Sequence, residues 1–183
     1  AFLKARLLLV RVILFDIDGT LVSTGGAGVK AFGEAFELAF GISNATEKTK
    51  FSGRTDFSLF RELCEWNKVE FSIPNRELFF NHYLQLIDKH LNEKVGGPFP
   101  GVIKMLDDLA SAPAPPAIGL LTGNIEEGAK RKLSTYNLWD RFSFGGFAND
   151  NEDRNLIAAA AMQKASEHLD CKLDGSEIVV VGD

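Results

Sequence analysis

Cysteine and net positive charge are both scarce in this sequence. Its 183 residues include two cysteines, Cys64 and Cys171, which lie far apart and form no CxxC pair. This pattern argues against a disulfide framework and a structural zinc site, and it favours a reducing, cytoplasmic environment. The formal net charge of −5 argues against nucleic-acid binding, because binding to a duplex usually requires a basic stripe. A small anionic molecule held in a local positive pocket stays compatible with this charge.

Long hydrophobic runs are absent as well, and none reaches the length of a membrane span. The segment from Leu3 to Phe15 resembles a secretion signal only superficially, because Arg11 interrupts the apolar run and no small-residue cleavage site follows. With 45% hydrophobic and 25% charged residues, the composition is typical of a globular protein. We therefore expect a soluble protein with one substantial core, or a core domain with a smaller insert.

Strands and helices are predicted to alternate over much of the chain. Apolar runs end at turn or polar residues and predict strands, whereas apolar residues at helical spacing predict the helices between them. The predicted strands are 12–15, 117–121, 144–148 and 177–183, and the predicted helices are 102–109, 125–136 and 153–169. This alternation predicts an α/β, Rossmann-like fold, with a mostly parallel sheet and helices on both of its faces.

One long segment interrupts the alternation with helices alone. Residues 29–40, 57–66 and 76–91 carry apolar side chains at helical spacing, and the turn-rich GGPFPG at 96–101 ends this block. The interruption predicts a helical cap inserted into the α/β core. We place the core at residues 1–22 and 97–183 and the cap at 23–96.

Polar residues follow three of the predicted strands. Asp16 and Asp18 come at the end of the first strand, Thr122-Gly123-Asn124 follow the second, and Asp183 follows the last. Parallel sheets bind ligands beyond the carboxyl ends of their strands, so these side chains are expected to meet in one crevice. Three carboxylates repel one another unless a cation offsets them, and Mg²⁺ is the natural hard cation for oxygen ligands.

Each of these features also has a simpler interpretation. Asp18-Gly19 is a strong turn signal, Thr122 could simply end a strand, and Asn124 could cap the following helix. Taken alone, Lys132 and Arg154 are interpreted as solvated helix charges. The three histidines lack metal-ligand spacing and are interpreted as structural or surface residues.

The motifs together resemble those of the haloacid dehalogenase (HAD) superfamily of hydrolases. DIDGTLV at 16–22 resembles the first motif, DxDGT, and LLTGN at 120–124 resembles the second. NDNEDRNL at 149–156 and IVVVGD at 178–183 resemble the third and fourth. The helical insert, including SGRTD at 52–56, resembles the type-1 cap of the phosphoglycolate phosphatase and β-phosphoglucomutase branch.

This resemblance implies a role for each acidic residue at the strand ends. Asp16 would be the nucleophile that forms an aspartyl-phosphate, and Asp18 would be the general acid and base. The implied Mg²⁺ ligands are Asp16, the main-chain carbonyl of Asp18, and Asp183.

The resemblance also implies groups that bind the phosphate. Thr122 and the amide of Gly123 or Asn124 would donate hydrogen bonds to phosphate oxygens, and Arg154 would offset negative charge. In the cap, Arg54 is expected to face the substrate, with a surface charge as the alternative.

The implied function is the Mg²⁺-dependent hydrolysis of a small phosphorylated metabolite. Asp18 favours phosphoryl transfer over dehalogenation, because dehalogenating relatives lack this second aspartate. A phosphomutase acting on a sugar phosphate and a non-catalytic binding protein remain as alternatives, and the substrate and oligomeric state stay open. Family members continue past the fourth motif, so the resemblance implies that the C-terminal part of the core is missing here.

Overall fold

The centre of the molecule is a four-stranded parallel sheet. The computed structural model describes residues 10–93, 95–149 and 151–183. The strands are β1 (Val12–Phe15), β4 (Ala117–Leu121), β5 (Gly145–Gly146) and β6 (Ile178–Val181), in the order β5-β4-β1-β6. Every neighbouring pair in this sheet is parallel, which confirms the α/β prediction.

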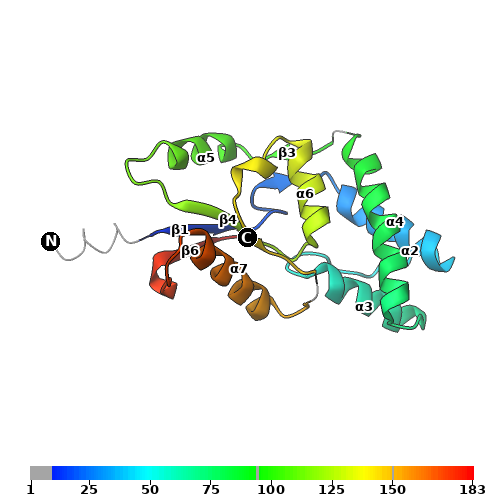
Figure 1. The fold of residues 1–183 in the computed structure, drawn as a ribbon. Helices are drawn as coiled ribbons and strands as arrows, with labels where there is room; N and C mark the ends of the chain where they lie inside the picture. The colour runs from blue at the N-terminus through cyan, green and yellow to red at the C-terminus, as the bar shows by residue number, and fades with distance from the viewer. Residues whose placement is uncertain (1–9, 94, 150) are drawn as a thin grey trace.

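Helices cover both faces of the sheet, as predicted. Phe15 of β1 packs with residues of α5 (Val102–Ala110) and α6 (Glu126–Thr135), whereas Val12 and Leu14 pack against α7 (Arg154–His168). This alternation follows from the pleat of a strand, in which successive side chains point to opposite faces. Figure 1 shows α5 and α6 on one side of the strands and α7 on the other.

Three further helices form a separate layer beyond the carboxyl ends of the strands (Figure 1). They are α2 (Ala27–Phe40), α3 (Asp56–Asn67) and α4 (Ile73–Leu91), and we refer to them, with the loops that join them, as the cap. Their buried side chains form one cluster that is rich in phenylalanine. The inserted helical cap is therefore present. Its predicted boundaries at residues 23 and 96 stay predictions.

Two very short strands lie where the chain passes between the sheet and the cap. β2 (Val22–Ser23) pairs antiparallel with β3 (Gly97–Pro98), so the outgoing and returning segments lie side by side. Two residues per strand carry no readable periodicity, which is why this pair could not be predicted from the sequence.

The sequence predictions differ from the structure mainly at element ends. The helices α2 and α4 begin at Ala27 and Ile73, earlier than predicted, and β5 is only two residues long. Leu78, one of the apolar residues at helical spacing in 76–91, is 42% exposed. Two 3-10 turns, at Trp139–Arg141 and Gly175–Glu177, complete the described elements. Within the described ranges, no helix combines the length and the apolar character needed to cross a bilayer.

Candidate active site

The predicted site residues all line one cavity at the carboxyl ends of β1, β4 and β6. The cavity has a volume of about 180 Å³ and lies between the sheet and the cap. Its lining includes every residue that we predicted for the site: Asp16, Asp18, Arg54, Thr122, Gly123, Asn124, Arg154 and Asp183. The structure thus brings together segments that are more than 150 residues apart in the sequence.

Asp16 lines this cavity and follows β1 directly. Its main-chain amide donates to the carbonyl of Val181 in β6, and its carboxylate accepts a hydrogen bond from the Ile17 amide at 2.8 Å. Burial raises the pKa of Asp16, although the Ile17 amide, the Thr122 hydroxyl and the charge of Arg154 act to lower it. A further positive charge near this carboxylate would favour the ionised form, which a nucleophile requires.

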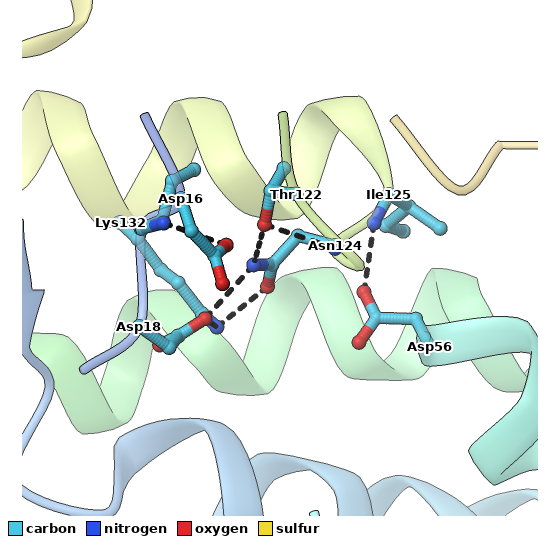
Figure 2. A network of polar contacts seen from close by, with 8 residues as sticks. Asp16, Asp18, Asp56, Thr122, Asn124, Ile125 and Lys132 are labelled. Atoms are coloured by element: carbon cyan, nitrogen blue, oxygen red, sulfur yellow. Dashed lines mark hydrogen bonds and ion pairs between the residues drawn. The ribbon is translucent and has the colours of Figure 1, made fainter. Parts of the chain in front are cut away.

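Asp18 is held by a pair of side chains from the segment after β4 (Figure 2). One oxygen, Oδ2, accepts hydrogen bonds from Asn124 Nδ2 at 2.8 Å and from Lys132 Nζ at 2.7 Å. Asn124 Nδ2 also donates to Thr122 Oγ1 at 2.7 Å. Asn124 therefore links the acid at the end of β1 to the hydroxyl at the end of β4.

The interpretation of Lys132 as a solvated helix charge is wrong. Its side chain is only 6% exposed, and its ammonium group contacts Asp18 Oδ2 and, at 2.6 Å, Asn124 Oδ1. Burial alone would lower the pKa of Lys132, but the neighbouring Asp18, Tyr83 and Asp56 raise it, so the ammonium form is retained. One signal in the sequence does indicate this position: Lys132 lies three residues after the apolar Ala129 and next to Leu133, so it belongs to the apolar face of α6.

The cap contributes a buried carboxylate, Asp56, the last residue of the SGRTD stretch at 52–56, for which no role was predicted. The Ile125 amide donates to Asp56 Oδ2 at 2.8 Å (Figure 2). The Asp56 amide in turn donates to the Gly123 carbonyl at 2.7 Å. Burial raises the pKa of Asp56 to about 6, with Asp18 adding to the rise and Lys132 and the Ile125 amide opposing it. Asp56 thereby joins the first turn of α3 to the start of α6.

Gly123 allows the cap loop to come this close. A Cβ at this position would overlap the carbonyl oxygen of Arg54 and would also crowd Thr55. Gly123 therefore has a packing role in addition to the phosphate-binding role that we predicted for its amide.

The two arginines differ in how they face the cavity. Arg54 lines the cavity, but its guanidinium lies 3.0 Å from Glu62 Oε2 and donates to Ser58 Oγ, so α3 holds it within the cap. Arg154 Nη2 lies 3.9 Å from Asp16 Oδ2, and Nη1 donates to the Gly53 carbonyl at 3.0 Å. Arg154 thus stands between the predicted nucleophile and the cap loop.

The oxygen atoms near Asp16 are of the kind that Mg²⁺ prefers. A Cβ on Gly19 would lie 2.8 Å from Asp183 Oδ2, and a Cβ on Gly182 would lie 3.6 Å from Asp16 Cβ, so Asp183 is beside the loop that carries both other acids. Among the described residues no group of three or more His, Cys, Asp or Glu side chains is arranged to hold a metal. The predicted ligand set needs only two such side chains and one carbonyl, because Mg²⁺ usually keeps several waters. The donors present fit this ion.

Comparison with known proteins identifies the family. The family model of haloacid dehalogenase-like hydrolases matches residues 13–183, whereas no curated protein matches the chain in sequence. Among solved structures, CbbY from Rhodobacter sphaeroides in complex with phosphate has a TM-score of 0.71 at 15% identity, covering 93% of this chain and 76% of that one. A predicted phosphoglycolate phosphatase from Haemophilus somnus has a TM-score of 0.61 at 14% identity, with coverage of 93% and 75%.

A structure assigned as a β-phosphoglucomutase, from Thermotoga maritima, is also similar. It has a TM-score of 0.54 at 16% identity, covering 93% of this chain and 74% of that one. At these identities the likeness shows a shared fold. The fold and the family model agree with the motif resemblance, and the chain belongs to the haloacid dehalogenase-like hydrolases.

Proposed function

We propose that this protein hydrolyses the phosphate monoester of a small metabolite, with Asp16 as the nucleophile and Mg²⁺ as the cofactor. The observation that carries the proposal is the convergence, in one cavity, of two acids after β1 with a hydroxyl, an amide and a guanidinium from other segments. A neutral or apolar ligand would not need these charged and hydrogen-bonding groups. A phosphoryl group does need them, because its negative charge is spread over several oxygens.

In the first step, a carboxylate oxygen of Asp16 attacks phosphorus. A bond forms between this oxygen and phosphorus, and the ester P–O bond breaks. Asp18 donates its proton to the departing oxygen, which leaves as an alcohol. Thr122 and the amides that follow it bind the phosphoryl oxygens at the start of α6, where the helix N-terminus favours negative charge.

In the second step, water attacks the phosphorus of the aspartyl-phosphate. Asp18, now ionised, takes a proton from this water, and the bond between phosphorus and Asp16 breaks. Inorganic phosphate and the original carboxylate of Asp16 result. Arg154, which is 3.9 Å from Asp16 Oδ2, offsets the negative charge in both steps.

The groups that would hold Mg²⁺ are the carboxylates of Asp16 and Asp183 and the main-chain carbonyl of Asp18. When bound, the ion supplies positive charge beside the nucleophile and the transferred group. Removal of divalent cations with EDTA should abolish turnover, and addition of Mg²⁺ should restore it. Full turnover without any divalent cation would contradict this part of the proposal.

The test of the nucleophile is Asp16→Asn, assayed by phosphate release from a panel of phosphorylated sugars and acids together with p-nitrophenyl phosphate. The neutral amide cannot form the acyl-phosphate, so turnover should fall by at least about a thousandfold on every substrate. Asp108→Asn, which changes an exposed acid on α5, is the matched control and should retain full activity. Equal turnover by Asp16→Asn and the unmodified protein would refute the assignment.

A phosphomutase is the second candidate. The contacts of Asp56 with Gly123 and Ile125 close the cap loop over the phosphate-binding segment, and an enclosed site favours transfer to a substrate hydroxyl over transfer to water. Product analysis with a sugar phosphate separates the two activities. Isomer formation without free phosphate would favour the mutase, and a lack of both activity and Mg²⁺ binding would favour a non-catalytic binding protein.

A further inference from the structure

Lys132 lies two turns into α6, yet its ammonium group reaches the end of β1. Long side chains on a helix point back toward its N-terminus, and α6 begins just after the polar segment that follows β4. This geometry places Nζ 2.7 Å from Asp18 Oδ2 and 2.6 Å from Asn124 Oδ1. The lysine thus contacts the proposed acid and base, and also the side chain that bonds to it.

The two donors meet at the same oxygen of Asp18. Lys132 Nζ and Asn124 Nδ2, at 2.7 and 2.8 Å, occupy the two acceptor positions of Oδ2. The second oxygen, Oδ1, is therefore the atom at which a proton can be held and transferred. Because two bonds fix the carboxylate from one side, they also fix the direction in which Oδ1 points.

The cap encloses this ammonium group. A Cβ on Gly28, in the first turn of α2, would lie 3.6 Å from Nζ. Tyr83 of α4 packs on α6, where a Cβ on Gly128 would lie 3.3 Å from its ring. A desolvated ammonium group is costly unless it is paired, so the covered lysine has a strong preference for its contacts with Asp18 and Asn124.

We infer that Lys132 is a positioning residue: together with Asn124 it holds Asp18 so that Oδ1 faces the leaving oxygen of the substrate once the cap is closed. This inference rests on the proposed function. It adds to the proposed function a residue of α6 whose ammonium group contacts Asp18 and Asn124, and it explains why a lysine is buried at this place.

Substrates with different leaving groups can test whether Lys132 positions Asp18. An alkoxide is a poor leaving group and needs the proton from Asp18, whereas p-nitrophenolate is stable enough to leave with little protonation. Loss of a positioning residue for the acid should therefore slow alkyl esters far more than p-nitrophenyl phosphate. Loss of a residue that only stabilises the fold should slow both substrates equally.

The experiment compares Lys132→Met, which removes the charge and keeps the apolar stem, with Lys130→Met, which changes an exposed lysine of the same helix. The kcat and KM are measured on p-nitrophenyl phosphate and on the alkyl phosphate that the unmodified protein turns over fastest. For Lys132→Met we expect kcat to fall about 100-fold on the alkyl ester and less than about 5-fold on p-nitrophenyl phosphate, with KM little changed. Lys130→Met should match the unmodified protein, and Asp18→Asn should show the same selective loss, to a greater degree.

Equal losses on the two esters, or no loss on the alkyl ester, would overturn the inference. If Lys132→Met does not fold, Lys132→Arg is measured in the same way and should show a smaller loss with the same selectivity. Asp16→Asn separates the two proposals. If it is inactive on both esters while Lys132→Met lacks selectivity, only the role of Lys132 fails; if it is fully active, the proposed function itself fails.

Discussion

The cap and the α/β core are stabilised by different kinds of interior. In the cap, aromatic rings pack on one another: Phe79 stacks on Phe60 at 4.6 Å between ring centres and meets Phe32 edge to face at 4.8 Å. In the core, mainly aliphatic side chains such as Leu14 and Leu120 cover the two faces of the sheet. Large rings suit helices that pack without a shared backbone ladder, because each ring contacts several neighbours at once.

The polar groups of the candidate site come mainly from the core rather than from the cap. Most side chains proposed for the reaction belong to the core, whereas the cap adds main-chain groups, Arg54 and the buried Asp56. The cap thus has its own apolar interior and contacts the candidate active site through a few polar groups. The apolar interior of the cap and its polar contacts with the core should therefore contribute unequally to stability, and three changes test this.

The largest effect is expected in the interior of the cap. Phe79→Ala removes a ring that is fully buried and in contact with several others, so the free energy of unfolding should fall by about 3 to 5 kcal/mol. Urea titration followed by circular dichroism measures this change. Leu78→Ala, at an exposed position of the same helix, is the control and should change stability by less than about 1 kcal/mol. Equal effects at the two positions would contradict the packing described for α4.

A smaller, pH-dependent effect is expected at the contact between cap and core. The pKa of Asp56 rises from the ordinary 3.8 to about 6, so the folded protein binds more protons than the unfolded chain between these values. The stabilising contribution of protonated Asp56 is present below about pH 4 and is lost as the pH rises to about 6. Asp56→Asn keeps an oxygen for the Ile125 amide and removes the titration.

The measurement is the free energy of unfolding of both proteins from pH 4 to pH 7. The unmodified protein should lose about 1 to 3 kcal/mol relative to Asp56→Asn over this window, and the difference should then stay constant. Other groups titrate in both proteins and cancel in the comparison. A difference that does not vary with pH would show that Asp56 is not the buried acid described here.

The smallest effect is expected at the exposed pair between Arg61 of the cap and Glu152 of the core. Their closest atoms are 2.6 Å apart, but the side chains are 48% and 29% exposed, so water and salt weaken the attraction. A double-mutant cycle with Arg61→Ala and Glu152→Ala should give a coupling energy of about 0.2 to 1 kcal/mol, decreasing at high salt. The cycle is needed because Arg61 also lies over the ring of Phe71. A coupling much above this range would mean that the cap is fixed to the core by charge.

Much of the fold could be predicted from the sequence because its elements have clear periodicities. Residues 12–15 and 117–121 form strands with the predicted bounds, and the polar residues after them lie in one cavity. The pairing of β2 with β3 could not be predicted, since two residues show no period. Leu78 shares the apolar spacing of α4 and is still exposed, because helical spacing defines a face of a helix but does not define how wide the buried part of that face is.

The burial of Lys132 and Asp56 could not be predicted from the local sequence around each residue. Each residue, taken within its own helix, looks like an ordinary surface charge or a helix start. Both are buried only because the cap closes on the start of α6, which brings residues 28, 56 and 83 beside residue 132.

The alternation of strands and helices, the helical insert and the acids at the strand ends could therefore be predicted from the sequence alone. These properties depend on local periodicity and on the rule that parallel strands end at one edge of a sheet. Which charges are buried and which atoms meet depends on the tertiary structure, as the two donors on Asp18 Oδ2 and the cap loop against Gly123 show. The reason is physical: burial and hydrogen-bond partners arise from packing between distant segments, and no local pattern encodes them.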